Sequence, residues 1–496
     1  MSQPARGTAD GPGGPLPRAG IGAGTGAAGT AAGGSGGSPP RAGSLGAVPL
    51  TLEGLRAEAA AGLIDTVIIA FTDMQGRLQG KRLSARYFLE EVAGHHAEAC
   101  NYLLAVDVEM NTVPGYEMSS WERGYGDFVL VPDLGTLRRV PWHPATALVL
   151  ADLTWHDGSP VAAAPRQILA QQTQRLARRG WTALAGSELE FIVFRDTYEQ
   201  ASARGYRGLT PANGYNVDYS ILGTARIEPL LRRIRNEMAG AGMYVESAKG
   251  ECNLGQHEIG FMYTDALTTC DNHVIYKTGA KEIAAQEGMS ITFMAKPNER
   301  EGNSCHLHLS LRDSGGAPVL AGDGPAGLSR LGEHFLAGQL AALPGLALCY
   351  APNINSFKRY TAASFAPTAI AWGPDNRTCA MRLVGRGASL RVENRVPGGD
   401  VNPYLAVAAM IAAGLHGIDN ELPLEPACAG NAYTAGAPQI PGSLRDALAA
   451  WQDSDLARQA FGSDVVAHYA NHARTELTAY GAAVTDWELR RGFERL

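Results

Sequence analysis

The stretch Gly186–Phe194, GSELEFIVF, decides the fold because it alternates acidic with apolar side chains. Successive side chains of a β-strand point to opposite faces of the sheet, so Glu188 and Glu190 share one face, about 6–7 Å apart. Apolar residues such as Leu189 and Phe191 share the other face and enter a core. Two carboxylates on one face repel each other unless a positive group lies between them. An exposed strand with solvated acids would explain this stretch equally well.

Three later stretches also carry polar side chains on one face. Lys249–Phe261 (KGECNLGQHEIGF) contains Glu251 and Glu258 on either side of a glycine-containing bend, a pattern that alone is also typical of a surface loop. In Asn303–Leu311 (NSCHLHLSL) the polar residues that face away from an apolar row are His306, His308 and Ser310. In Leu390–Val396 (LRVENRV) the alternating polar residues are Arg391, Glu393 and Arg395.

Together the four stretches predict a sheet with one apolar face and one face that carries carboxylates, histidines and arginines. Hard divalent cations prefer carboxylate oxygen, and imidazole is a common further ligand. The five carboxylates and one histidine suit two ions better than one. Paired ions are the usual means of phosphoryl transfer. We therefore predict a polar funnel that holds two divalent cations.

An arginine-rich segment separates the third stretch from the fourth. Asn355–Tyr360 (NSFKRY) contains Arg359, and Asn376–Leu383 (NRTCAMRL) contains Arg377 and Arg382. Guanidinium groups bind carboxylates and phosphates through paired hydrogen bonds, so this segment indicates an anionic substrate and a nucleotide phosphate. The sequence contains no GxxxxGK[ST] motif, so a nucleotide would bind without a P-loop.

Composition restricts the class of protein. The net charge is −7, and no block of lysine and arginine indicates nucleic-acid binding. No apolar run is long enough to span a membrane. Residues 1–48 hold 15 of the 60 glycines and almost no large apolar side chain, which predicts a disordered tail that is not a secretion signal. Seven widely spaced cysteines without a CxxC pair favour a reducing cytoplasm.

The order of expected elements predicts two domains after this tail. Residues 49–155 contain short β-branched runs and few helices, which favours a small sheet-rich domain. A strong helical pattern at Arg166–Arg179 opens a second domain, residues 160–496, in which helices and strands alternate. One of its expected helices covers Leu328–Ala342.

In this order and spacing, ExE, ExxxGQHE, HxHxSL, NSxKR, NR…R and RxExRxP…NPY resemble the glutamine synthetase family over about residues 65–496. The resemblance implies an α+β fold, with a small N-terminal β-grasp domain and a large catalytic domain built on a curved antiparallel sheet surrounded by helices. It also implies ring-shaped homo-oligomers, commonly dodecamers, in which each active site lies between adjacent subunits.

The resemblance also implies roles for individual residues. One Mg²⁺ or Mn²⁺ ion would be held by Glu190, Glu251 and Glu258. The other would be held by Glu188, His306 and Glu393. Glutamate would be bound by Arg359, Arg395 and the nearby Gly302. ATP would lie near His308, Ser310, Arg377, Arg382 and Arg391. The γ-carboxylate of glutamate would attack the γ-phosphate of ATP, and an amine would then displace phosphate, with Arg359 and Arg377 neutralising developing charge.

The segment after NSxKR departs from the family. Ammonia-using members read roughly xxPGxEAP there, and their glutamate takes a proton from ammonium, whereas Tyr360–Pro367 (YTAASFAP) has Phe365 in its place. Asp107 matches the aspartate of the family's ammonium pocket, but the serines that follow it are missing. A phenyl ring is no base, although it can pack against a carbon chain or bind a cation through its face.

We therefore expect a γ-glutamyl ligase for a small organic amine, most similar to γ-glutamylethanolamide and γ-glutamylpolyamine synthetases. Glu109 or Glu301 would serve the charge of the amine. A true glutamine synthetase that uses ammonia is the first alternative. A non-catalytic protein with the same fold and a non-haem iron oxygenase are further alternatives, and neither accounts for the whole set of acids and arginines. The sequence does not identify the amine.

Overall fold

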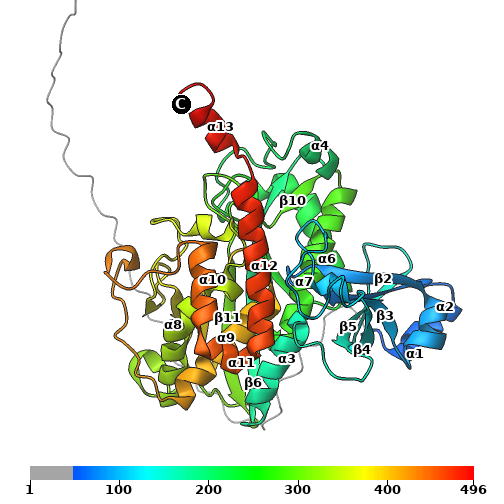
Figure 1. Ribbon diagram of the computed structural model, residues 1–496, viewed down its shortest axis with the longest axis horizontal. Coiled ribbons are helices and arrows are strands. Elements are labelled where there is room, and N and C mark those ends of the chain that lie inside the picture. The colour runs from blue at the N-terminus through cyan, green and yellow to red at the C-terminus, as the bar shows by residue number, and fades with distance from the viewer. Residues whose placement is uncertain (1–48) are drawn as a thin grey trace, which may run out of the picture. The chain divides into compact units, whose positions relative to one another are not determined.

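The computed structural model describes residues 49–496, so the predicted disorder of residues 1–48 lies outside the described residues. Within the described part, the strands form two sheets (Figure 1). The first sheet has the order β2-β1-β5-β4-β3. Its strands are β1 Thr66–Thr72, β2 Leu78–Ser84, β3 Ala97–Cys100, β4 Asp127–Arg139 and β5 Thr146–Thr154. The central pair β1 and β5 is parallel, and the other neighbours are antiparallel.

Both faces of the central strand β1 of the first sheet carry buried residues. Val67 and Ile69 on β1 enter a core of their own, beneath helix α1 (Leu52–Ala60) and the short helix α2 (Ala85–Tyr87). Ala70 belongs to the larger core of the rest of the chain. The sheet-rich character expected for residues 49–155 is therefore present, while the division of the chain into domains at this boundary stays a prediction.

The second sheet contains the four stretches whose polar side chains were predicted to share one face. Its path is β12-β13-β14-β11-β6-β8-β7, with β9 and β10 paired to β6. Apart from the parallel pair β12 and β13, its neighbours are antiparallel. The strands are β6 Trp181–Phe194, β7 Val245–Gly250, β8 Gln256–Phe261, β9 Thr264–Asp265, β10 Ser290–Thr292, β11 Cys305–Asp313, β12 Trp372–Pro374, β13 Met381–Val384 and β14 Arg391–Asn394.

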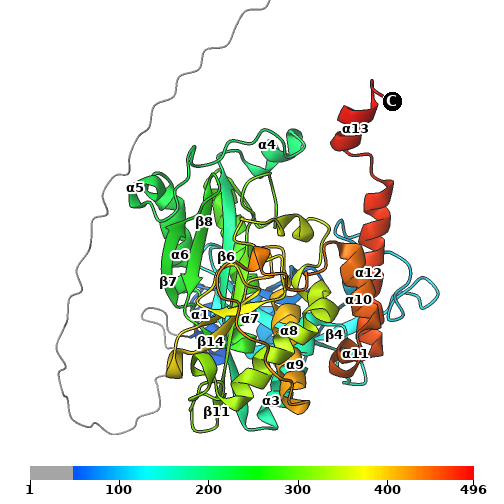
Figure 2. The ribbon, with the colours of Figure 1, turned by 90° about the vertical axis from the view of Figure 1, so that its left-hand side faces the viewer.

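Helices cover the apolar face of this sheet. Helices α3, α7 and α9 contact it, α8 packs along α9, and Figure 2 shows β6, β8 and β7 side by side. The helices are α3 Pro165–Ala177, α4 Tyr198–Ala203, α5 Ile221–Thr224, α6 Glu228–Gly240, α7 Ala266–Gln286, α8 Arg330–Tyr350, α9 Pro403–Asp419, α10 Leu444–Asp453, α11 Asp455–Phe461, α12 Ser463–Ala482 and α13 Asp486–Gly492. No helix among residues 49–496 combines the length and apolarity needed to cross a bilayer. The α+β fold expected from the resemblance is confirmed.

The expected end of one helix was wrong. The sequence predicted a helix over Leu328–Ala342, but α8 continues through Pro344 to Tyr350. Residues 346–350 are buried against the neighbouring helices α9 and α10. Burial of this apolar turn outweighs the backbone hydrogen bond that a proline removes.

A buried arginine joins the first sheet to the helices of the second. Arg166, at the start of α3, pairs with Asp133 on β4 at 2.7 Å and with Asp152 on β5 at 2.6 Å. It also pairs with Asp271 on α7 at 3.0 Å. The hydroxyl of Tyr404 donates to Asp271 at 2.6 Å. This polar network fixes the first sheet against α3 and α7.

Candidate active site

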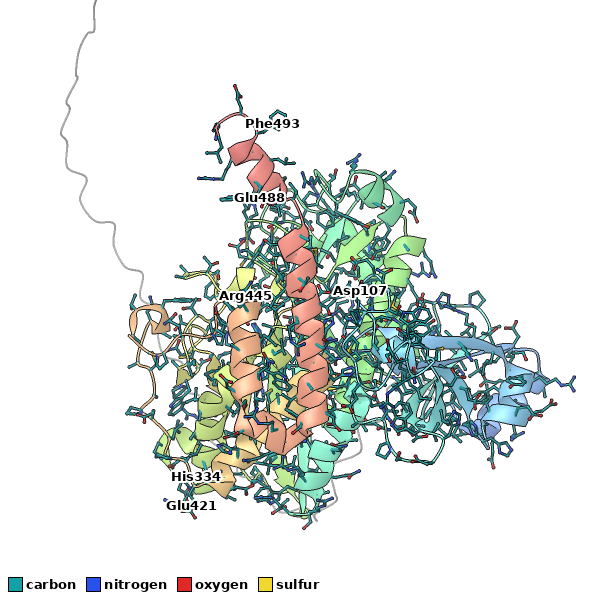
Figure 3. All side chains as sticks on the ribbon, viewed as in Figure 1. Asp107, His334, Glu421, Arg445, Glu488 and Phe493 are labelled. Carbon is teal, nitrogen blue, oxygen red and sulfur yellow. The ribbon has the colours of Figure 1, made fainter. Side chains whose placement is uncertain are left out.

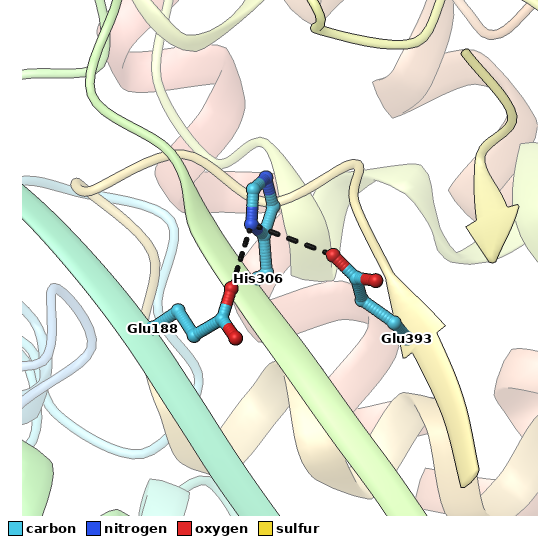
Figure 4. Close-up of side chains that lie close together, drawn as sticks. All are labelled: Glu188, His306 and Glu393. Carbon is cyan, nitrogen blue, oxygen red and sulfur yellow. Dashed lines mark hydrogen bonds and ion pairs between the residues drawn. The ribbon is translucent and has the colours of Figure 1, made fainter. Parts of the chain in front are cut away.

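The register of the second sheet brings one trio of predicted metal ligands together. His306 on β11 lies directly opposite Glu188 on β6, and the Nδ1–Oε2 distance is 3.1 Å. Glu393 on β14 lies 3.5 Å from the same nitrogen (Figure 4). The three side chains each offer one ligand atom within 4.8 Å of the others. Cross-strand pairing of three sequence-distant strands thus builds this group.

A second trio forms one strand further along. Glu190 on β6 and Glu258 on β8 are direct cross-strand partners, and Glu251 joins them within 4.8 Å. Gly255, with φ +72°, makes the bend between β7 and β8 that returns the chain. The backbone N–H of Ser304 donates to Glu190 at 2.7 Å and holds its carboxylate in place. Both trios match the ligand sets that the family resemblance implied.

The electrostatics of the two trios differ. Burial opposes the ionisation of Glu188, but hydrogen bonds from His306 and His308 outweigh it and lower its pKa. Burial raises the pKa of Glu258 to about 8, with a further contribution from the charge of Glu188. The ammonium of Lys249 contacts Glu251 and lies 3.8 Å from Glu258. Such a concentration of carboxylate oxygen suits a divalent cation, which supplies the missing positive charge.

Glu393, the third member of the trio with Glu188 and His306, is fully buried. Burial disfavours its charge, but His306 and Arg395 together lower its pKa. Arg395 donates to Glu393 at 2.5 Å, and Arg382 donates to its other oxygen at 2.8 Å. Arg382 on the neighbouring strand β13 and Arg395 directly after β14 thus hold this carboxylate near His306.

A cavity of about 370 Å³, here called the front cavity, opens over both trios. Besides metal-ligand candidates, it is lined by the predicted substrate residues Gly302, Arg359, Phe365 and Arg395, and by Arg377 and Arg382, which were predicted to lie near ATP. Arg359 is buried and donates to the carbonyl of Val396 at 2.9 Å. The Nε of Arg395 is buried without a hydrogen-bond partner. The cavity therefore concentrates positive charge opposite the acidic trios, as an anionic substrate requires.

Phe365 lies at the edge of the front cavity. Its side chain is 59% exposed, and its backbone has φ +58°, a left-handed conformation that is strained for a residue with a side chain. Its carbonyl accepts a hydrogen bond from Nη2 of Arg395 at 3.3 Å. The position expected to hold a proton acceptor in ammonia-using relatives thus carries an apolar ring beside Arg395, one of the arginines predicted to bind glutamate.

A second cavity of about 560 Å³, here called the rear cavity, lies on the other side of the trios. Its lining includes three of the residues predicted to bind ATP, which are His308, Ser310 and Arg391. Arg391 donates to Nδ1 of His308 at 3.2 Å, and Nε2 of His308 lies 3.0 Å from Glu188. Glu188 and Glu258 line both cavities and form the wall between them. Arg377 and Arg382, also predicted for ATP, line the front cavity instead.

Asp107 is not brought to the front cavity of its own chain. It accepts hydrogen bonds from the backbone and side chain of Asn111, and Figure 3 shows it beside α12. Its charge, with that of Glu109, raises the pKa of Glu476 on α12, although burial is the larger cause. Glu301, the other acid suggested for the amine, lines the front cavity.

Among the residues of the front cavity that sequence reasoning missed are Tyr219, Lys249 and Gln256. Gln256 donates to Glu190 at 3.1 Å, and the Lys249 ammonium lies 5.0 Å from the centre of the Tyr219 ring. The signal for Lys249 was its position two residues before Glu251, which places both on one face. Tyr219 lies in an irregular segment whose sequence carries no periodic pattern.

Comparison with known proteins agrees with this geometry. A family model described as glutamine synthetase, catalytic domain, matches residues 162–492. The chain is 67% identical over 448 residues to gamma-glutamylethanolamide synthetase GlnA4 of Streptomyces coelicolor, across 90% of this chain and 96% of that protein. It is 38% identical over 434 residues to glutamate–isopropylamine ligase of a Pseudomonas species, across 86% and 95%. A solved GmaS/ADP complex covers 89% of this chain and 99% of its own, with TM-score 0.78 and 29% identity.

The antiparallel sheet, its two acidic trios and the opposing arginines define an enzyme of the carbon–nitrogen ligase class. The chain belongs to the glutamine synthetase family. The family and enzyme class expected from the motifs are thereby confirmed.

Proposed function

We propose that this protein is an ATP-dependent ligase that joins the γ-carboxylate of glutamate to a small organic amine, with ethanolamine as the preferred amine. The observation that carries the choice of an organic amine is Phe365, an apolar side chain at the edge of the front cavity. The 67% identity to a gamma-glutamylethanolamide synthetase over nearly the whole chain supports ethanolamine in particular.

The two cavities suit two substrates that meet at the acidic wall. ATP would enter the rear cavity, where Arg391 and His308 offer donors to phosphate oxygens. Glutamate would enter the front cavity, where Arg359 and Arg395 offer donors to its carboxylates. The γ-phosphate and the γ-carboxylate would then meet at the wall between the cavities.

Each trio has the donor set of a divalent-cation site, so two Mg²⁺ or Mn²⁺ ions are proposed, one for each trio. Bound there, the cations would neutralise charge on the transferring phosphoryl group. In the first step the γ-carboxylate attacks the γ-phosphorus and forms γ-glutamyl phosphate and ADP. Arg377 and Arg359 both line the front cavity, so their positive charges would stabilise the negative charge that develops in this step.

In the second step the amine attacks the acyl carbon and releases phosphate. The amine must first lose a proton, and Phe365 cannot accept it. Glu301 lines the front cavity and is the proposed acceptor in the same chain. Asp107 lies beside α12, outside its own front cavity, so we propose that it completes the site of an adjacent subunit in a ring-shaped homo-oligomer. Seven free thiols fit the proposed cytoplasmic location.

The test is phosphate release from ATP and glutamate with ethanolamine, isopropylamine, putrescine and ammonium at equal concentrations of the free base. We expect the highest kcat/KM with ethanolamine. A preference for isopropylamine or putrescine would reject ethanolamine but keep the organic-amine ligase. A preference for ammonium would show a true glutamine synthetase. Mass spectrometry of the product provides the control that the amine is incorporated.

A further inference from the structure

Two cysteines from distant parts of the sequence meet beside the loop that carries Arg377. Cys379 lies between β12 and β13, and Cys428 lies between α9 and α10. Both pack into a small apolar cluster with Ala371 and Ala432. The two thiols are free, and Cys428 packs against the cluster that contains Cys379. The structure thus holds a dithiol 49 positions apart in sequence, from 379 to 428.

Backbone hydrogen bonds hold the two cysteines in this arrangement. The N–H of Cys428 donates to the carbonyl of Trp372 at 2.8 Å, and its own carbonyl accepts from Nδ2 of Asn376 at 3.2 Å. The carbonyl of Asn376 in turn accepts from the N–H of Cys379 at 3.3 Å. The hydroxyl of Thr378 accepts from the N–H of Ala432 at 2.9 Å, which ties the same two segments again.

The two thiols differ in how easily a small molecule reaches them. Cys379 is fully buried, whereas Cys428 is partly exposed and lines an open hollow of about 500 Å³ next to Arg377. Burial, together with the neighbouring Cys428, raises the pKa of Cys379 to about 12. The thiolate is the reactive form of a cysteine, and burial disfavours it at Cys379. An oxidant therefore meets the partly exposed Cys428 first.

We propose that Cys379 and Cys428 form a redox-active pair that a peroxide converts into an intramolecular disulfide. The sulfur of Cys428 attacks a peroxide oxygen, the O–O bond breaks, and a sulfenic acid and one water form. The sulfur of Cys379 then attacks the sulfenic sulfur, which forms the S–S bond and releases the second water. Two thiols are oxidised, and one hydrogen peroxide is reduced to two waters.

Formation of the disulfide would affect the front cavity through the short segment that follows Cys379. The two sulfurs must approach to about 2 Å to form a disulfide, which draws together the segments that carry Cys379 and Cys428. The carbonyl of Ala380 accepts from the N–H of Arg395 at 2.9 Å, and Arg377 and Arg382 line the front cavity. Oxidation therefore displaces arginines of the substrate site and lowers ligase activity, a consequence that rests on the proposed function.

The disulfide itself is tested without any activity measurement. The full-length protein is treated with a small excess of hydrogen peroxide, unfolded without reductant, and its thiols are counted. We expect the count to fall from seven to five, and a peptide containing Cys379 joined to Cys428 to appear in a non-reducing digest. Cys428→Ser should keep six thiols. Seven thiols in the treated wild type, or a disulfide between another pair, would overturn the proposal.

The activity arm separates this proposal from the proposed function. Peroxide should lower phosphate release with ethanolamine at least about fivefold, and dithiothreitol should restore it. Cys428→Ser should lose this response, whereas Cys100→Ser, which removes a half-buried thiol of the first sheet, should keep it. If Cys428→Ser is inhibited as strongly as wild type, the link to activity is wrong. If the disulfide forms in a protein that turns over no amine, the proposed function fails and the redox pair stands.

Discussion

Gly302 lies directly under the aliphatic part of Arg359. A Cβ built on Gly302 would lie 2.5 Å from Cγ of Arg359 and 2.2 Å from the carbonyl oxygen of Ala295. No side chain fits there without moving the arginine or the backbone. The position of Arg359, which is proposed to bind glutamate, therefore depends on the absence of a methyl group at residue 302.

Gly302→Ala should weaken glutamate binding because it displaces Arg359. We expect KM for glutamate to rise about tenfold or more, which corresponds to about 1.4 kcal/mol, while KM for ATP changes little. Gly94→Ala is the matched control, because a Cβ there meets nothing within 4 Å. An unchanged KM for glutamate in a folded Gly302→Ala protein would show that Arg359 does not bind glutamate.

Phe365→Glu should shift the enzyme toward ammonia, because it supplies a carboxylate at the edge of the front cavity. We expect the ratio of kcat/KM for ammonium to that for ethanolamine to rise about tenfold or more. Phe365→Leu, which keeps an apolar side chain in the same strained backbone, should leave the ratio near that of wild type. Equal ratios in all three proteins would remove Phe365 as a determinant of the amine.

Added Mg²⁺ should stabilise the protein more in alkaline than in neutral buffer. The pKa of Glu258 is raised to about 8 from its ordinary value of 4.5, so the folded state binds its proton more tightly than the unfolded state does. The stability that this protonation gives is fully present below the pKa of Glu258 in the unfolded state. It disappears as the pH rises through the pKa of Glu258 in the folded state. Metal-free protein is thus destabilised at high pH by the charge that the cation neutralises.

The measurement is the gain in Tm on adding Mg²⁺ at about pH 6.5 and pH 8.5, and we expect a gain about 1–2 °C larger at the higher pH. Groups remote from the site titrate in the same way with and without metal, so their effect on Tm cancels in the gain measured at each pH. Glu258→Gln should abolish most of the difference. A metal-induced gain that is the same at both pH values would contradict the account.

Removal of Arg166 should destabilise the fold strongly, because Asp271 would lose its buried cationic partner. We expect Arg166→Met to cost about 3–5 kcal/mol, with Asp271→Asn in the same chain recovering part of the loss. Arg86→Ala removes an exposed pair with Glu90 and should cost about 1 kcal/mol or less. Chemical denaturation of the three variants checks this, and equal losses for Arg166→Met and Arg86→Ala would refute it.

Alternation along single strands predicted which polar side chains share a face of the sheet. The family resemblance, and not alternation, assigned Glu188 and His306 to one metal, and the structure pairs these two residues directly. Local patterns could not supply the path of irregular segments, so Tyr219 was missed. They also could not place Asp107, because its position follows from packing against α12 and not from periodicity. Burial by distant helices likewise extended α8 past Pro344.

The wall formed by Glu188 and Glu258 has a consequence for inhibitor design. Because these two carboxylates line both cavities, a compound that occupies the front and the rear at once must pass between them. A linker at that point would need a tetrahedral anionic group, such as a phosphinate, that could share the proposed cations, since a neutral chain would leave the acids facing each other. Selectivity against ammonia-using enzymes would then come from a small apolar substituent directed at Phe365, where the family resemblance implies a glutamate in those enzymes.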